Sequence, residues 1–445
     1  MTSKTYSRQQ LVVILMLIGV AGIISPISSA IYFPALIDIR NNLNTTDALM
    51  DVTVAGFLVT MGIFPLLWGT LADAYGRRGV FLVSMFLYSV SSAACGLAQS
   101  ITVLIAMRIV QGATSSAAMV TGAGVITDIF PPEKRGTALG TFLIGPLIGP
   151  VVGPIIGGYF NEYLGWRCIF WFLATLGALI LVCLILILPE TLSQQQAYPF
   201  TFTLCPPSVQ RTGSLINPFH PLTYLKYSKV ALVIAYVCII YSSYYFVTSS
   251  QTRVLSNVYS LTSSQVGLCY IPLGLGNFVG SITGGRISDA ILHRYRQKST
   301  VPRLEVRMYG VTWGAISIVV GLAALGFCLE LRWPLAATLG SEFLVGFGMT
   351  SVFSGTSTYL IDLFSHHASS IMACNTCLRT LAAAIVTSLN THILNNLSYT
   401  WAFSTFTLLQ LPGILALIFL IFFANNMYPL PSEKSDVQNR IIHKP

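Results

Sequence analysis

The sequence is dominated by apolar runs close to the roughly 20 residues that a helix needs to span a lipid bilayer. Twelve such runs follow one another, and polar segments separate them. Their bounds, to within a few residues, are 11–34, 51–72, 80–99, 101–128, 136–160, 166–188, 229–251, 264–287, 308–329, 335–361, 368–392 and 399–426. Only 9% of the residues are charged, whereas soluble domains carry about 25%. The pattern predicts an all-α polytopic membrane protein with twelve transmembrane helices.

The basic residues predict how the chain is oriented. The first run follows Lys4 and Arg8, so a cleaved signal peptide is the alternative to a retained helix, but the length of this run and the spans after it favour the retained helix. Eighteen of the 24 basic residues lie in predicted cytoplasmic segments if the N-terminus is cytoplasmic. The exceptions are Arg40, Arg167, Arg253 and Arg332 in outer loops and Arg108 and Arg379 within spans. The positive-inside rule therefore places both termini in the cytoplasm, and the net charge of +9 gives no reason to expect a nucleic-acid partner.

The cysteines indicate neither a disulfide framework nor a metal site. They are scattered, mostly in or beside spans. Cys374 and Cys377 form a CxxC motif, but it lies inside an apolar run without a second pair or a histidine nearby. Helix packing is the preferred interpretation, and no metal or other cofactor is expected. Sequons at Asn44 and Asn396 fall in predicted outer loops, which agrees with the topology.

The chain divides into two halves that repeat one unit. The longest gap between spans, 189–228, separates a six-helix bundle at 11–188 from another at 229–426, with short cytoplasmic ends at 1–10 and 427–445. GTLAD at 69–73 matches GRISD at 285–289, and the glycine-to-aspartate spacing of 112–128 recurs at 346–362. Parallel halves around a midplane substrate site are a known transporter design. We therefore expect two pseudo-symmetric six-helix bundles.

The repeat also relates charged residues. At an offset of 234 residues, Arg108 corresponds to Glu342, and Gly145 corresponds to Arg379. The first relation predicts a base and an acid that face each other across the pseudo-twofold axis. The second shows that the glycine-proline run GPLIGPVVGPIIGG at 145–158 has no counterpart in the second half. Fold symmetry therefore does not require this run.

Several segments carry a family resemblance. They are SSAIYFPAL at 28–36, GTLADAYGRR at 69–78, RIVQG at 108–112, the glycine-proline run at 145–158 and PETL at 189–192. Together they resemble the major facilitator superfamily, and within it the twelve-helix drug:proton antiporters. SSAIYFPAL is similar to fungal members grouped around quinidine resistance and the export of weak acids and amino acids. The second-half copy of the loop motif departs from the pattern because Leu292 stands where the first copy has Gly76.

The loop motif is interpreted as a conformational latch. Its candidate residues are Gly69, Asp73, Gly76, Arg77, Arg78, a possible partner Arg135, and Asp289 in the second half. Asp73 is predicted at the cytoplasmic end of a helix, where it can accept from a neighbouring helix N-terminus or pair with a base. Contacts that form in one conformation and break in another create a bistable element. The alternative is a topogenic loop whose arginines only hold it in the cytoplasm.

The glycine-proline run is interpreted as a close-packing helix. Gly145, Gly149, Gly153 and Gly157 recur every four residues and share one helix face. The adjoining residues of the motif are Pro146, Pro150, Pro154 and Gly158. Small residues let a neighbouring helix approach closely, and the prolines favour kinks. We expect a tight, deformable seam between the two halves, and the resemblance links this motif to antiport; packing without a coupling role is the alternative.

Three charged residues fall at mid-membrane depth, namely Arg108, Glu342 and Arg379. Charges at this depth are costly and by default indicate function. Burial favours the neutral form of a carboxyl group and a nearby arginine favours its charged form, so changing surroundings would let Glu342 load and release a proton. A static buried ion pair is the alternative. Asp38 and Asp51, at the outer mouth, either join this proton route or are solvated loop acids.

Other residues are candidates for contacting a substrate. Tyr241, Tyr244 and Tyr245 share one helix face and provide a surface for flat or cationic compounds, although packing tyrosines are an equal alternative. Gln111 and Asn375 are predicted at mid-helix depth, where their amides offer polar contacts. The substrate cavity is therefore expected to include Arg108, Gln111, Tyr241, Tyr245, Glu342, Asn375 and Arg379.

These features predict a monomeric, proton-coupled antiporter that exports small organic molecules, in a fungal plasma membrane. Its partners are a small-molecule substrate, protons and the lipid bilayer, and no enzymatic activity is expected. A facilitator or proton symporter that imports a nutrient and a substrate-sensing receptor are the alternatives. Glu342 favours cationic substrates and the two arginines favour anionic ones, so drugs, weak organic acids, polyamines and amino acids all remain open.

Overall fold

The computed structural model describes residues 7–191, 220–298, 304–364 and 368–423, and these residues form helices and no strands. Twelve helical stretches, from Gln9–Asn42 to Tyr399–Phe422, are long and apolar enough to cross a membrane. The predicted all-α architecture with twelve spans is therefore confirmed. Large apolar side chains such as Leu186, Trp313 and Phe422 are exposed, as expected of a surface that faces lipid.

The elements fall into two sets along the chain. The first half comprises α1 (Arg8–Ala30), η1 (Phe33–Ala35), α2 (Leu36–Asn42), α3 (Asp47–Tyr75), α4 (Arg77–Gly96), α5 (Ile101–Ser115), α6 (Ala117–Ile129), α7 (Pro132–Leu164) and α8 (Arg167–Ile187). The second half comprises η2 (His220–Lys226), α9 (Ser228–Tyr259), α10 (Ser263–Lys298), η3 (Leu304–Arg307), α11 (Met308–Glu330), α12 (Leu335–Leu363), α13 (Ala368–Ser388), α14 (Asn390–Asn396) and α15 (Tyr399–Phe423).

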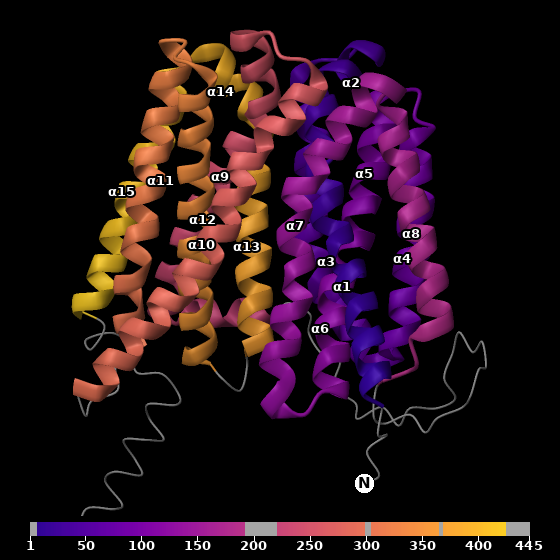
Figure 1. The fold of residues 1–445 in the computed structure, drawn as a ribbon, viewed down its shortest axis with the longest axis vertical. Coiled ribbons are helices and arrows are strands. Elements are labelled where there is room, and N and C mark those ends of the chain that lie inside the picture. The colour runs from indigo at the N-terminus through magenta and orange to yellow at the C-terminus, as the bar shows by residue number, and fades with distance from the viewer. Residues whose placement is uncertain (1–6, 192–219, 299–303, 365–367, 424–445) are drawn as a thin grey trace, which may run out of the picture.

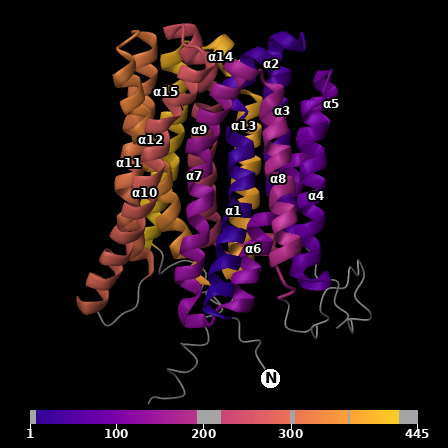
Figure 2. The same ribbon diagram turned by 45° about the vertical axis from the view of Figure 1, so that its right-hand side comes forward.

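The two halves stand side by side with their helices roughly parallel (Figures 1 and 2). Two seams join them, one between α7 and α10 and the other between α3 and α13. Each seam pairs the second span of one half with the fifth span of the other. This reciprocal pairing is the arrangement expected of two repeats related by a twofold axis, so the halves inferred from the matching motifs are related in space as well.

Local sequence signals set the ends of several helices. Ser7 begins α1 with a capping box, and Thr46 and Ser100 accept hydrogen bonds from the first turns of α3 and α5. Gly76 and Gly165 end α3 and α7 with φ values of +99° and +85°, which favour glycine. The short elements α2 and α14 lie at one end of the bundle, and the first turn of α1 lies at the other (Figure 1).

Candidate functional site

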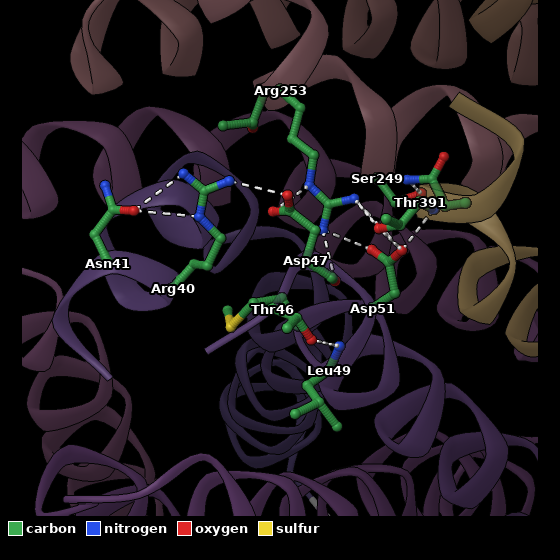
Figure 3. A network of polar contacts seen from close by, with 12 residues as sticks. Arg40, Asn41, Thr46, Asp47, Leu49, Asp51, Ser249, Arg253 and Thr391 are labelled. Carbon is green, nitrogen blue, oxygen red and sulfur yellow. Dashed lines mark hydrogen bonds and ion pairs between the residues drawn. The ribbon is translucent and has the colours of Figure 1, made fainter. Parts of the chain in front are cut away.

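A buried ion-pair cluster joins the two halves at the α2–α14 end (Figure 3). A guanidinium nitrogen of Arg253, in α9, lies 2.8 Å from Oδ1 of Asp51, in α3. Thr391, in α14, donates to the other oxygen of Asp51 through its backbone N–H at 2.8 Å and its hydroxyl at 2.6 Å. Asp51 is 1% exposed and Arg253 is 8% exposed. Buried charges with full sets of partners make strong contacts, so we call Asp51, Arg253 and Thr391 the inter-half cluster.

Asp51 and Arg253 of the inter-half cluster lie in other surroundings than the sequence predicts. Asp51 is buried, so its interpretation as a solvated loop acid is wrong. Arg253 was assigned to an outer loop, but α9 continues to Tyr259 and holds Arg253 inside the helix. The apolar residues Val254, Leu255 and Val258 continue the helical spacing beyond the predicted end of this span. That spacing is a sequence signal that Arg253 lies within a helix. No comparable signal in the sequence marks Thr391 as a functional residue.

Further hydrogen bonds join the halves at the same end. Oδ2 of Asp38 in α2 accepts a hydrogen bond from Ser263 of α10 at 3.1 Å and another from Asn161 of α7. The hydroxyl of Thr252 in α9 donates to the backbone oxygen of Phe33 at 2.9 Å. No hydrogen bond or ion pair between two described residues joins the halves at the opposite end. Among the described residues, the polar contacts between the halves are therefore confined to the α2–α14 end.

The opposite end carries one charge cluster within each half. Arg77 lies 2.6 Å from Asp73 and 3.3 Å from Asp128 in the first half. In the second half, Arg307 lies 2.6 Å from Asp289 and 2.8 Å from Asp362. The repeated aspartates thus have the same role in both halves, although the arginine comes from a different place in the chain. The proposed pairing of Asp73 with Arg135 is wrong, because Arg135 donates to the backbone oxygens of Thr127 and Phe130 at the end of α6.

The PETL motif docks onto the loop motif of the same half. Glu190 accepts from the backbone N–H groups of Arg77 and Arg78 at 3.0 and 3.1 Å, which caps the N-terminus of α4. Arg78 also donates to the backbone oxygen of Ile185 at 2.8 Å. A Cβ atom on Gly76 would lie 2.6 Å from Oε2 of Glu190, and one on Gly69 would lie 3.2 Å from Val120. Both glycines therefore lie at positions where a side chain would crowd a neighbouring residue.

Replacing Gly76 by alanine is expected to lower the free energy of unfolding by about 2 kcal/mol, because the φ of +99° strains any side chain and the new Cβ displaces Glu190. Gly79→Ala is the matched control, since a Cβ at Gly79 meets nothing within 4 Å. Thermal unfolding of both variants in detergent measures the difference. Equal unfolding temperatures for the two variants would contradict this explanation of the motif.

Arg108 and Glu342 do not meet. Arg108 is fully buried in the first half, with the rings of Tyr32 and Phe57 4.5 and 4.4 Å from its guanidinium carbon. It donates to the backbone oxygen of Ser28 at 3.1 Å and to Gln111 at 2.8 Å. Gln111 itself donates to Ser92 at 2.8 Å and is fully buried. The expected facing pair across the pseudo-twofold axis is therefore wrong in this conformation, because these partners all belong to the first half.

Glu342 is enclosed by the second half and is 2% exposed. It accepts a hydrogen bond from Gln251 of α9 at 2.9 Å, and no basic side chain in the described part of the chain bonds to it. It lines a small, partly open hollow between helices of the second half. The other lining residues are Val247, Ser250, Gln251, Val254, Leu255, Leu325, Leu329 and Phe403. The static ion pair proposed as an alternative for Glu342 is thus absent among the described residues.

A third set of candidates lies together in the second half. The guanidinium carbon of Arg379, in α13, lies 4.5 Å from the ring centre of Tyr241 and 4.3 Å from that of Phe353. The rings of Tyr241 and Tyr245 are 5.0 Å apart. Asn375 lies one turn before Arg379 and is fully buried. We call Tyr241, Tyr245, Asn375 and Arg379 the arginine–tyrosine cluster.

The glycine-proline motif packs mainly inside its own half. A Cβ on Gly145 would lie 2.6 Å from the backbone oxygen of Gly19, and one on Gly149 would lie 2.8 Å from Pro26, both in α1. Gly153 and Gly157 likewise face Ile31 at the end of α1. Despite Pro146, Pro150 and Pro154, α7 is one continuous helix. The expected seam between the halves is therefore wrong for the four-residue glycine repeat.

The contact of α7 with the other half is made by neighbouring positions of the same motif. Gly158 lies against Ser263 and Gly267 of α10. A Cβ on Gly267 would lie 2.5 Å from the backbone oxygen of Pro154, and one on Gly274 would meet Val151. The motif thus supports two close packings at once, with α1 on the glycine face and α10 on an adjoining face.

A helical bundle of two related halves, with charge clusters at both ends, is an arrangement known from membrane transporters. Comparison with known proteins agrees, since the family model described as Major Facilitator Superfamily matches residues 18–302. The chain belongs to this family, and the predicted recognition is confirmed. Members are transporters of small molecules, which agrees with the expectation that the protein is no enzyme.

Individual relatives cover most of the chain. Citrate exporter 1 of Aspergillus niger is 31% identical over 417 residues, which are 85% of this chain and 79% of the relative. Multidrug transporter DTR1 of Candida glabrata is 28% identical and covers 94% of this chain and 85% of its own length. A solved bacterial homologue of the human lysosomal transporter Spinster, described as inward-facing and unoccupied, superposes with a TM-score of 0.67 at 15% identity over 94% of this chain and 96% of its own.

Proposed function

We propose that this protein is a proton-coupled antiporter that exports small organic molecules by alternating access. The observation that carries the proposal is that, in the described part of the chain, polar contacts between the halves lie at one end, in the inter-half cluster and the links at Asp38 and Thr252. Such contacts stabilise one of two conformations, and their exchange for contacts at the other end would produce the second. The names of the relatives, an exporter and a multidrug transporter, support export as the direction.

The distribution of basic residues supports an orientation. Because cytoplasmic loops carry the excess of Lys and Arg, we assign the α2–α14 end to the outside and both termini to the cytoplasm. The plasma membrane of a fungus is the proposed location, since these relatives are fungal transporters. The described conformation is then closed to the outside. We propose that residues 11–188 and 229–426 of a monomer rock against each other around a central substrate site.

We propose Glu342 as the proton-carrying residue. Its carboxyl group is enclosed, receives one hydrogen bond from Gln251 and has no bonded cation among the described residues. A buried carboxyl group whose surroundings change between two conformations exchanges a proton at each side. Asp51 is less suited to this role because its carboxylate pairs with Arg253 and accepts hydrogen bonds from Thr391 in the inter-half cluster.

Transport in inside-out membrane vesicles tests the proposal. An acidic vesicle interior is expected to drive accumulation of at least one of citrate, quinidine and spermidine, and a proton ionophore is expected to abolish it. Accumulation that is insensitive to the ionophore would contradict proton coupling. Accumulation only when substrate and protons move in the same direction would identify a symporter instead.

Replacing Glu342 by glutamine is expected to remove the dependence of transport on interior pH, because the amide keeps a hydrogen-bonding group but carries no exchangeable charge. The control is Glu330→Gln, which removes an acid from the exposed end of α11. The measurement is the initial rate of accumulation across a series of interior pH values. A pH profile identical to that of the unmodified protein would exclude Glu342 from the proton route.

A further inference from the structure

The arginine–tyrosine cluster holds a cation that the described part of the protein does not neutralise. Arg379 lies within a membrane-spanning helix, half-buried, and makes no hydrogen bond or ion pair with any described residue. Tyr241 and Phe353 contact its guanidinium through their rings. Ring contacts of this kind hold the cation in place but leave its N–H donors without acceptors. The Nε atom is in fact buried without a partner.

A second polar group in the same place also lacks partners. Asn375 is fully buried, yet neither the nitrogen nor the oxygen of its side-chain amide has a hydrogen-bond partner. Buried polar side chains are paired in the large majority of cases. Because residues four apart share one helix face, Asn375 and Arg379 present their donors on the same side of α13. Two neighbouring polar side chains without hydrogen-bond partners indicate that a ligand supplies those partners.

Arg108 has hydrogen-bond acceptors that Arg379 lacks. Arg108 also lies between two aromatic rings and is fully buried, and Ser28 and Gln111 accept hydrogen bonds from one of its terminal nitrogens, although its Nε and its other terminal nitrogen have no partner. Arg379 has the rings without the acceptors. The two buried acids Glu342 and Asp51 do not neutralise Arg379, since Glu342 is hydrogen-bonded to Gln251 and Asp51 is paired with Arg253. The arginine–tyrosine cluster is therefore positively charged.

The cluster also lies where a transported molecule would pass. Helix α13 forms a seam with α3 of the other half, and a Cβ on Gly62 of α3 would lie 3.2 Å from the backbone oxygen of Cys377. The cluster is thus within one helical turn of the boundary between the halves. Tyr241 and Tyr245 add an aromatic surface to the same position.

We propose that Arg379 and Asn375 bind the carboxylate of an organic anion, and that Tyr241 and Tyr245 pack against its carbon skeleton. Arginine matches carboxylate geometry with two parallel hydrogen bonds, and the Asn375 amide supplies a further donor. This inference deepens the proposed transport function, since it assigns organic acids in their anionic form as the substrate class.

Binding of defined probes to the purified protein in nanodiscs tests the inference without any proton gradient. At pH 7.4, citrate and benzoate are expected to bind, and Arg379→Gln is expected to weaken both by at least about 30-fold, as for loss of a charged hydrogen-bonding partner. Arg379→Lys should lose about tenfold, because an ammonium group keeps the charge but not the paired geometry. Arg332→Gln, which removes an exposed charge at the far end of α11, is the control and should bind as the unmodified protein does.

A second variant separates charge from folding. Asn375→Asp places a carboxylate one turn from Arg379, which is expected to abolish anion binding and leave quinidine binding unchanged or stronger. Anion binding that survives both Arg379→Gln and Asn375→Asp would overturn the inference, as would binding of quinidine alone to the unmodified protein. The second result would leave proton-coupled export intact. Conversely, anion binding without proton-driven accumulation would contradict the proposed function and not the site.

Discussion

Replacing Asp51 by asparagine is expected to open the α2–α14 end of the protein. Asp51 is the buried acceptor that holds both Arg253 and Thr391. Its loss leaves the Arg253 charge buried without its main partner, which costs about 3–5 kcal/mol. A change of that size shifts a two-state equilibrium by more than about 100-fold. The closed conformation would therefore no longer dominate, and transport that depends on alternation would fall sharply.

Hydrogen–deuterium exchange along the end of α9 and along α14 measures this opening. Asp47→Asn is the matched control, because Asp47 also pairs with Arg253 but its side chain is 29% exposed and it shares its charge with Arg40. Exposed ion pairs contribute about 1 kcal/mol or less, so exchange should change little. Equal exchange in the two variants would show that the inter-half cluster does not hold this end closed.

Replacing Gly157 by leucine is expected to prevent α7 from packing on α1. Even the Cβ of a new side chain would overlap the backbone oxygen of Ile31, and backbone cannot move aside without separating the helices. Overpacking of this kind costs about 3 kcal/mol or more. We expect the variant to yield little folded protein, with the remainder unfolding at a markedly lower temperature.

Gly140→Leu is the control within the same helix, because a Cβ at Gly140 meets nothing within 4 Å. This change should be neutral or slightly stabilising, since leucine forms helices better than glycine. Thermal unfolding and the yield of monodisperse protein compare the two variants directly. Similar behaviour of both would mean that the close approach of α7 and α1 does not support the fold.

The sequence predicts the fold well because each span carries its own signal. An apolar run of sufficient length specifies a helix, and the repeated glycine and aspartate spacings relate the halves. Local turn signals were also informative, as Gly76 shows, because a positive φ and a close neighbour both require glycine. Helix ends that depend on tertiary contacts were harder. The spacing of the apolar residues after Arg253 indicates that α9 continues, but the burial of Arg253 depends on Asp51, which lies 202 residues away.

The pairing of functional residues was the least predictable part. An offset between repeats relates positions in sequence, but it does not specify which way side chains point within a bundle. Arg108 turns into its own half because Tyr32, Phe57 and Gln111 surround it there. Similarly, the glycine repeat identified a close packing, whereas the choice of α1 as its partner follows from the arrangement of all helices. The motif identified residues of the charge cluster around Asp73, but it did not identify which base pairs with Asp73.

Three consecutive residues of α9 contact three different parts of the molecule. Gln251 donates to Glu342, Thr252 donates to Phe33 of the opposite half, and Arg253 pairs with Asp51. Consecutive residues on a helix move almost as one rigid unit, because each is fixed by the same backbone ladder. A tilt or rotation that withdraws Arg253 must therefore also disturb the hydrogen bond at Glu342. In the proposed mechanism, opening of the α2–α14 end and the change of proton at Glu342 are therefore coupled through less than one turn of α9.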